Sequence, residues 1–415
     1  MEEEEWKKME RARGSEEKED RLSDLPDYIL HYILSFLDTK FAVQTSVLSK
    51  RWEHLWSYLP ILKLHYSGFN TIASFNKFVS WCLSHRDGST PVHDLEFWHY
   101  GRVPPALLKR FFRYAVSHDI QQLSMAVSLN FTFPPSFLTC KSLTTLRIEN
   151  WDGEEIPNSL DFPMLATLEL RQIRFPSGEN GCLNPFSNCS KLKTLILDNC
   201  SYPKSSILCI SAPQVANLTF HHNCIMSDCY NIKLSSPNLS SFVFIGFLPP
   251  LLSAEDIPFL DKLEIQARRS PVLEQDQKSA LVLLEMLTVL STAKSITLSA
   301  STVEILSCNH DFKNIPDVSF CNLKSWKLNM CGMTASRFFV LCYLLLKSPP
   351  CAEVLFMLSG RRVIRTTIEQ ICNQNETKVT ELKSVDNVNA ELCLKFLASR
   401  PWDTTATPTE QSSAS

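Results

Sequence analysis

The chain has 415 residues, of which 44% are hydrophobic and 20% are charged, so it is long enough to bury a large core. Its formal net charge of -3 excludes a bulk electrostatic attraction to nucleic acid or to an anionic membrane surface. No run approaches the ~18 consecutive apolar residues of a membrane-spanning helix. We therefore expect neither a nucleic-acid partner nor a membrane partner.

The first segment, residues 1–20, holds nine acidic and five basic residues. It lacks the apolar stretch of a secretory signal peptide, which favours a nuclear or cytoplasmic protein over a secreted one. Its composition predicts a solvated, disordered arm.

Residues 22–59 contain three short helical patterns. Ser23 and Asp24 stand at an N-cap position before Pro26, and two further segments begin at Thr39 and Ser49. A unit of this size cannot bury two apolar stripes and two tryptophans by itself. Part of its apolar surface is therefore expected to contact another protein.

This stretch resembles the F-box of the plant F-box/leucine-rich-repeat proteins. Matching residues include Leu25-Pro26-Asp27, Leu34-Ser35-Phe36-Leu37 and Ser49-Lys50-Arg51-Trp52, in the same order and spacing. The resemblance implies a small helical domain that binds a Skp-type adaptor, and through it a cullin, in an SCF-type ubiquitin ligase. The alternative is an ordinary helical cap on the domain that follows.

The resemblance also implies which side chains meet the adaptor. The contact would be formed or supported by Leu25, Pro26, Ile29, Leu30, Ile33, Leu37, Val47, Leu48 and Trp52. A second set would instead pack inward against the first repeat: Leu34, Phe36, Trp56 and Leu59. The sequence does not fully separate the two sets.

A pattern of the form apolar-x-x-apolar-x-apolar recurs after the F-box. Its starts at 143, 165, 192, 215, 239 and 260 differ by 22, 27, 23, 24 and 21 residues. These periods match the leucine-rich repeat, for which ~20–29 residues are typical. The last two apolar positions of each block alternate with a polar one, as in a strand with one buried face. Stacked blocks would bury one another's leucines beneath a parallel sheet.

Weaker copies extend this array in both directions, starting at 59, 92, 120, 293, 323 and 351. Helical patterns lie between the early copies, near 75–83 and 107–115, and between the late ones, within 268–292 and 333–347. Residues 323–358 also resemble part of the FBD region found in the same plant family. We predict an α/β fold: a three-helix F-box followed by a leucine-rich-repeat solenoid, with helices on the outer face of a parallel sheet.

The expected domain organisation follows from these patterns. It comprises a disordered arm at 1–20, the F-box at 21–58, the solenoid at 59–365, capping helices at 366–400 and a disordered tail at 401–415. The capping helices would cover the last open edge of the sheet.

Histidines and cysteines are the residues most suited to metal binding in this sequence. His221, His222, Cys224 and Cys229 form the sharpest metal-like cluster, but adjacent residues on a strand face opposite sides, so we expect no metal site. The 15 cysteines contain no C-x-x-C motif and are scattered. In a reducing compartment they are expected to behave as small buried hydrophobes rather than as disulfides.

No nucleophile elbow, phosphate loop or zinc-protease helix is present, and no cofactor is expected. The favoured interpretation is a non-enzymatic binding module that presents an unknown target protein to a ubiquitin ligase. The alternatives are a small-ligand receptor that uses the inserts at 268–292 and 361–365, a repeat-based interaction protein outside the ligase, and an enzyme with a ubiquitin-carrying cysteine. The basic clusters Arg268-Arg269 and Arg361-Arg362 with Arg365 are expected to be solvated.

Overall fold

A computed structural model describes residues 25–373 of the chain. Within that range the following positions are not described: 87, 89, 129–132, 151–154, 179–180, 204–205, 224–229, 248, 255–256, 258–259, 272, 309–317, 330–340, 342–343, 346 and 358–362. The chain divides into two compact units, Met1–Ser128 and Leu129–Ser415. The arm, the tail and most of the expected capping segment lie outside the described residues, so the domain boundaries drawn from the sequence stay predictions.

The first unit begins with the helices of the F-box region. Helix α2 spans Asp27–Ser35, helix α3 spans Thr39–Gln44, and two 3-10 helices follow, η1 at Thr45–Val47 and η2 at Leu55–Tyr58. The third helical segment is therefore a series of tight turns rather than a continuous α-helix. The backbone N–H of Trp52 donates to the carbonyl of Ser49 at 3.0 Å, which closes the first of these turns.

Three parallel strands complete the first unit: β1 (Ile61–His65), β2 (Asp94–Arg102) and β3 (Gln122–Ser128). Helix α4 (Ile72–His85) connects the first pair and helix α5 (Pro105–Ser117) connects the second. The register aligns Leu62 with Leu95 and Leu95 with Leu123, which confirms the repeat spacing read from the sequence.

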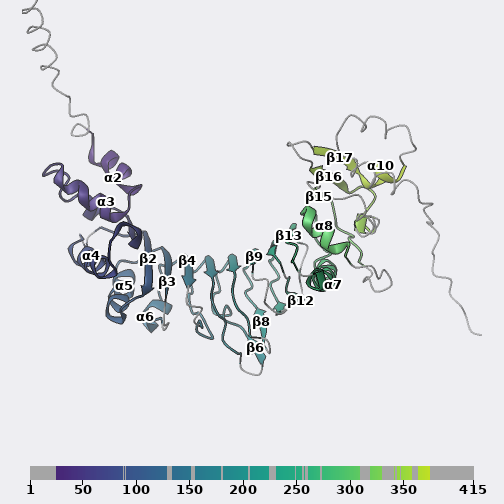
Figure 1. Cartoon of the computed structure of the whole chain (residues 1–415), viewed down its shortest axis with the longest axis horizontal. Coiled ribbons are helices and arrows are strands. Elements are labelled where there is room, and N and C mark those ends of the chain that lie inside the picture. The colour runs from purple at the N-terminus through teal and green to yellow at the C-terminus, as the bar shows by residue number, and fades with distance from the viewer. Residues whose placement is uncertain are drawn as a thin grey trace, which may run out of the picture. The chain divides into compact units, whose positions relative to one another are not determined.

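The second unit is built on a long sheet, here called the main sheet (Figure 1). Its parallel strands are β4 (Thr145–Asn150), β5 (Thr167–Arg171), β7 (Thr194–Asp198), β9 (Asn217–His222), β11 (Ser241–Gly246), β13 (Lys262–Ala267), β14 (Ser295–Leu298), β15 (Ser325–Asn329) and β16 (Glu353–Met357). Each begins two residues after the first apolar position of its block, so that position lies in the turn entering the strand.

The core of the second unit consists of aligned apolar columns. Leu146, Leu168 and Leu195 occupy one register position on successive strands, and all three are fully buried. Toward the end of the array Trp326 takes the same position between Ile296 and Val354. The predicted solenoid principle is thus confirmed, because each repeat buries its neighbour's apolar residues.

A second sheet replaces the outer helices in the middle repeats. Strands β6 (Cys182–Leu183), β8 (Ile207–Ile210), β10 (Asn231–Leu234) and β12 (Leu251–Ala254) form a four-stranded parallel sheet in the order β12-β10-β8-β6. The short periods of these repeats explain the difference, since 21–27 residues leave space for a short strand rather than for a helix.

Helices cover the later repeats as expected. Helix α7 (Leu273–Val289) packs on β12 and on helix α8 (Ala300–Leu306), and its Leu284 and Leu287 are fully buried. Two short helices, α6 (Pro135–Leu138) and α10 (Ile368–Asn373), and the 3-10 helix η3 (Tyr66–Gly68) complete the described elements. No helix among the described residues is long and apolar enough to cross a membrane.

The main sheet ends in an unexpected reversal. Strand β17 (Val363–Thr367) pairs antiparallel with β16, whereas the preceding strands are parallel. On this strand Arg365 bonds Glu353 of β16 at 2.9 Å. The described start of the C-terminal segment is therefore a strand followed by α10, and the rest of the predicted capping helices lies outside the described residues.

Candidate protein-binding surfaces

The F-box helices sort their apolar side chains between a core and an exposed face. Leu30 and Leu34 of α2 and Ala42 of α3 are completely buried. Opposite them, Tyr28, Tyr32 and Phe36 recur every four residues and are 70%, 64% and 66% exposed. Tyr32 and Phe36 contact each other edge-to-face, with ring centroids 4.9 Å apart. Four-residue spacing places all three rings along one side of the helix.

The turn after α3 adds two more exposed apolar residues. Val47 is 88% exposed and Leu48 is 59% exposed. Arg51, just beyond them, donates from Nε to Asp27 Oδ1 at 2.9 Å and also bonds the carbonyl of Leu25, so the turn is tied to the start of α2. We call the exposed F-box face the set Tyr28, Tyr32, Ile33, Phe36, Val47 and Leu48.

The residues expected to contact or support the adaptor differ in solvent exposure. Ile33, Val47, Leu48 and Pro26 are exposed, and Leu25, Ile29 and Leu37 are half-buried. Leu30 and Trp52 are buried, so they can support the exposed F-box face only from behind.

The inward-facing set is mostly as expected. Leu34, Trp56 and Leu59 are buried, but Phe36 is exposed. Phe36 lies one residue beyond the end of α2 and extends the row of exposed aromatic residues. The sequence alone did not assign Tyr28, Tyr32 or Phe36 to an exposed face. The signal was present in the sequence as aromatic residues at positions i, i+4 and i+8.

Polar contacts hold the F-box helices on the first strand. The backbone N–H of Lys63 donates to the Thr39 hydroxyl at 2.9 Å, and its ammonium donates to the Ser35 carbonyl at 3.0 Å. The ring nitrogens of His65 lie 2.9 Å from Asp38 and 3.0 Å from Glu96. Because these contacts span α2, α3, β1 and β2, the exposed F-box face rests on a fixed base within the first unit.

The exposed face of the main sheet carries a ladder of opposite charges. Glu169 accepts from Arg171 at 2.6 Å and lies 3.3 Å from Arg147. Asp198 continues the ladder, 3.8 Å from Arg171 and 3.5 Å from His221. These charges neutralise one another, so this part of the sheet presents no single-sign field to a partner.

A more neutral strip follows along the same face. Ile196, Thr219 and Val243 share one register position on β7, β9 and β11, and all three are partly exposed. Side chains of this kind can contact a protein surface by packing and hydrogen bonding, but they carry no sequence-readable specificity.

The histidine pair behaves as its strand position predicts. His221 lies on the exposed face of β9, and His222 points into the core with 4% of its surface exposed. No group of histidine, cysteine and acidic side chains suited to a metal ion occurs among the described residues, a part of the chain that excludes Cys224 and Cys229. Burial lowers the pKa of His222 to about 4 from an ordinary value of 6.5.

The buried His222 predicts a pH-dependent stability. Between pH 6.5 and about pH 4 the unfolded chain binds a proton at this residue while the folded chain does not. Stability is therefore lost as the pH falls through that window, by up to about 3 kcal/mol for this single group. Urea unfolding at several pH values should show this loss in the wild type, and a smaller loss in His222→Asn. The matched control, Thr219→Asn at a non-titrating position of the same strand, should keep the wild-type slope; equal slopes in all three proteins would contradict the assignment.

Two arginines of the basic clusters, Arg269 and Arg365, are paired with acidic side chains of the chain, and Arg268 is exposed. Arg269 lies 3.4 Å from Asp276 of α7 and 3.5 Å from Glu304 of α8. Arg365 pairs with Glu353, and Arg361 and Arg362 lie outside the described residues. The insert at 268–292 is thus mainly the packed helix α7 rather than a basic ligand-binding loop.

Comparison with known protein families agrees with this architecture. Residues 22–64 match the F-box domain, and residues 108–246 match a family described as the leucine-rich repeats of the FBD-associated F-box protein At5g56370. The chain thus carries an F-box followed by leucine-rich repeats, and in this order of domains it resembles the plant F-box/leucine-rich-repeat proteins.

Individual relatives in Arabidopsis thaliana support the same class. The putative FBD-associated F-box protein At5g56700 is 35% identical over 42% of this chain and 45% of its own length. The F-box/LRR-repeat protein At3g26922 is 26% identical over 72% of this chain and 95% of its own length. The F-box/FBD/LRR-repeat protein At3g52680 is 31% identical over 53% of this chain and 49% of its own length. The chain thus spans about half the length of several relatives it matches.

Proposed function

We propose that this protein is the substrate-recognition subunit of an SCF-type ubiquitin ligase. The observation that carries the proposal is the exposed F-box face, where large apolar side chains lie on a structurally fixed helix pair. Side chains such as Tyr28 and Phe36 gain most when a partner covers them, because aromatic residues dominate interface energetics. The partner is a Skp-type adaptor, which in turn binds a cullin.

In this proposal the repeats hold a target protein while the chemistry takes place elsewhere. The ligase acts by proximity, because the target's lysine is brought to a thioester formed on another protein. The chain itself is non-catalytic and needs no cofactor. The exposed face of the main sheet, with its neutral strip at Ile196, Thr219 and Val243, is the proposed target surface. The proposed location is the nucleus or the cytoplasm.

The small-ligand receptor is the weaker candidate. Its anion-binding side chains would have to come from the basic clusters, but Arg269 and Arg365 already bind carboxylates of the chain. A receptor of this kind would raise its melting temperature in the presence of inositol phosphates, because a ligand that binds only the folded state stabilises it.

The test is direct capture of the adaptor. The full chain, co-expressed with a plant Skp-type adaptor, should purify as a one-to-one complex that stays together in size-exclusion chromatography. An excess of a second protein that carries an unrelated F-box should displace the chain from the complex, because the two F-boxes bind the same site on the adaptor. A folded chain that fails to bind the adaptor at micromolar concentration would overturn the proposal.

A further inference from the structure

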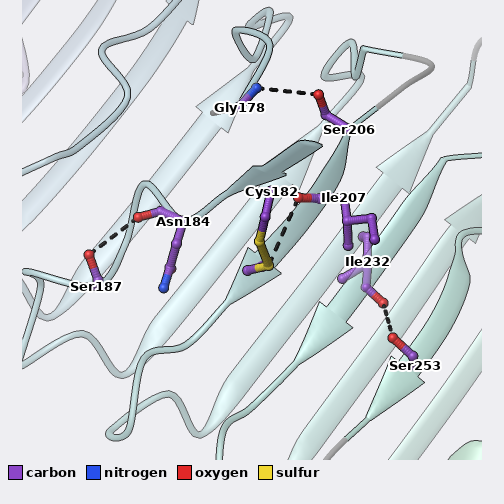
Figure 2. Close-up of a disulfide and its surroundings, with 9 residues drawn as sticks. Gly178, Cys182, Asn184, Ser187, Ser206, Ile207, Ile232 and Ser253 are labelled. Atoms are coloured by element: carbon purple, nitrogen blue, oxygen red, sulfur yellow. Dashed lines mark hydrogen bonds between the residues drawn. A yellow bond between two sulfur atoms is a disulfide. The ribbon is translucent and has the colours of Figure 1, made fainter. Parts of the chain in front are cut away.

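Two cysteines that are far apart in sequence meet on the four-stranded sheet (Figure 2). Cys182 of β6 and Cys209 of β8 are joined by a disulfide, with Cα atoms 6.5 Å apart and a sequence separation of 27. That separation lies within the range that an S–S bond spans. The expectation of cysteines without disulfides therefore does not hold for this pair.

The backbone around Cys182 is shaped for this approach. Gly181 has a φ of +77°, and its N–H donates to the Gly178 carbonyl at 3.2 Å, which closes a turn directly before Cys182. A Cβ at Gly178 would clash with the Cys182 carbonyl oxygen. The N–H of Gly178 donates to Ser206, next to β8, at 3.3 Å (Figure 2). The turn therefore brings Cys182 alongside β8 through contacts other than the disulfide.

The two partners differ in accessibility. Cys182 is exposed, whereas Cys209 is buried with 7% of its surface accessible. The register pairs Cys182 with Ile207, so Cys209, two residues further along β8, projects from the same face as Cys182. A soluble thiol or disulfide can thus react with Cys182 first. Cys209 lies close enough to Cys182 to attack the mixed disulfide that forms there.

Other described cysteines are poor candidates for the same chemistry. Cys189 and Cys200 are buried, and burial raises the pKa of both thiols, that of Cys200 to about 12. Neither is joined to a second cysteine in the structure, and attack on a soluble disulfide requires an accessible thiolate, so these two residues are unreactive while the chain is folded. Cys321 and Cys351 are exposed, but each is free in the structure.

We propose that Cys182 and Cys209 form a reversible redox modification site that takes low-molecular-weight disulfides such as glutathione disulfide. The Cys182 thiolate attacks one sulfur of glutathione disulfide, which forms a mixed disulfide and releases one glutathione thiolate. The Cys209 thiolate then attacks the Cys182 sulfur and releases the second. The two cysteines lose two protons and two electrons, and glutathione disulfide is reduced to two glutathione molecules. Excess reduced glutathione reverses both steps.

The bond has a structural consequence for the middle repeats. Strand β6 is only two residues long and lies at the edge of its sheet, with two register pairs to β8. Such a short edge strand contributes little by itself. Closing the 27-residue loop restricts the unfolded chain and so stabilises the folded form. Oxidation would therefore stabilise the repeats from β6 to β8 against unfolding, and reduction would destabilise them.

The test uses the full chain in glutathione buffers that range from reduced to oxidised. After free thiols are trapped with N-ethylmaleimide, peptide mass spectrometry should show the Cys182–Cys209 bond rising and falling reversibly with the buffer. The oxidised form should melt about 5 °C or more above the reduced form. Absence of the bond in oxidising buffer would overturn the proposal, as would its survival in the folded protein under millimolar reduced glutathione.

Matched single variants test the order of the steps. In Cys209→Ser the exposed Cys182 should accumulate as a mixed disulfide with glutathione, because no second thiol resolves it. In Cys182→Ser the buried Cys209 should stay unmodified in the folded chain. Equal modification of the remaining cysteine in both variants would contradict the proposed order. The readouts do not involve adaptor binding, so they are independent of the proposed ligase function.

Discussion

Replacing Val47 and Leu48 together by aspartate is expected to weaken adaptor binding by at least about 100-fold. More than half of the surface of each side chain is exposed. The folded chain therefore tolerates the two charges, because water solvates them. In the complex the same carboxylates would be buried against an apolar partner, and an unpaired buried charge is costly. Isothermal titration calorimetry with purified Skp-type adaptor measures the loss.

The control for this variant is a similar apolar-to-aspartate change outside the exposed F-box face. Met164→Asp introduces a charge at an apolar side chain of the second unit that is 44% exposed. It should bind the adaptor with wild-type affinity. Urea unfolding of Val47→Asp/Leu48→Asp should match the wild type within about 0.5 kcal/mol, as for surface substitutions generally. Wild-type adaptor affinity in the double variant would remove the exposed F-box face from the proposal.

The second large effect is expected at the centre of a late repeat. Trp326 is completely buried in the main sheet, and its indole N–H donates to the Ser348 hydroxyl at 2.9 Å. Trp326→Ala should lower the free energy of unfolding of the second unit by about 3–5 kcal/mol, because it removes a large side chain and leaves a cavity. Urea unfolding followed by circular dichroism measures this change.

A phenylalanine at the same position separates packing from hydrogen bonding. Trp326→Phe retains an aromatic ring but loses the indole donor, while Ser348 still donates to the Leu344 carbonyl at 2.9 Å. Its cost should therefore be smaller, about 1–3 kcal/mol, for a partly refilled site and one lost hydrogen bond. An alanine variant within 1 kcal/mol of the wild type would show that this repeat does not depend on Trp326.

The repeat strands were predictable from sequence because their spacing is imposed by packing. A residue such as Leu168 or Leu195 has to face the core at one fixed register, and a one-residue slip would turn it to solvent. The period alone therefore locates the strands. At one register position Trp326 is aligned with Ile296 and Val354, so the array accommodates a tryptophan there without a shift in register.

The second sheet and the cysteine pair were not predictable in the same way. Strand β6 contains only Cys182 and Leu183, which is too short for any periodicity to appear. The approach of Cys182 to Cys209 depends on the stacking of one repeat on the next and on the turn at Gly181. Contacts that arise between repeats leave no signal in the spacing within a repeat.

The F-box face was predictable in kind but not in detail. The sequence indicates an excess of apolar surface, but it places Phe36 in the inward-packing set, whereas Phe36 is exposed in the structure. Two apolar stripes on one short helix look equivalent until the element that covers one of them is known. Here that element is the turn region around Trp52 and Trp56, whose tight turns the helical spacing did not reveal.

The contacts of Thr39 and Asp38 with β1 bear on how such a protein can be divided or recombined. A cut after residue 58 would remove Lys63 from the Thr39 hydroxyl and His65 from the Asp38 carboxylate. It would also uncover Leu59, which is buried in the intact unit. An exchange of adaptor-binding parts between related chains would therefore preserve these bonds only if the strands of the first unit travelled with the helices. The structural unit that holds the F-box helices in place therefore extends beyond the F-box motif into the strands of the first unit.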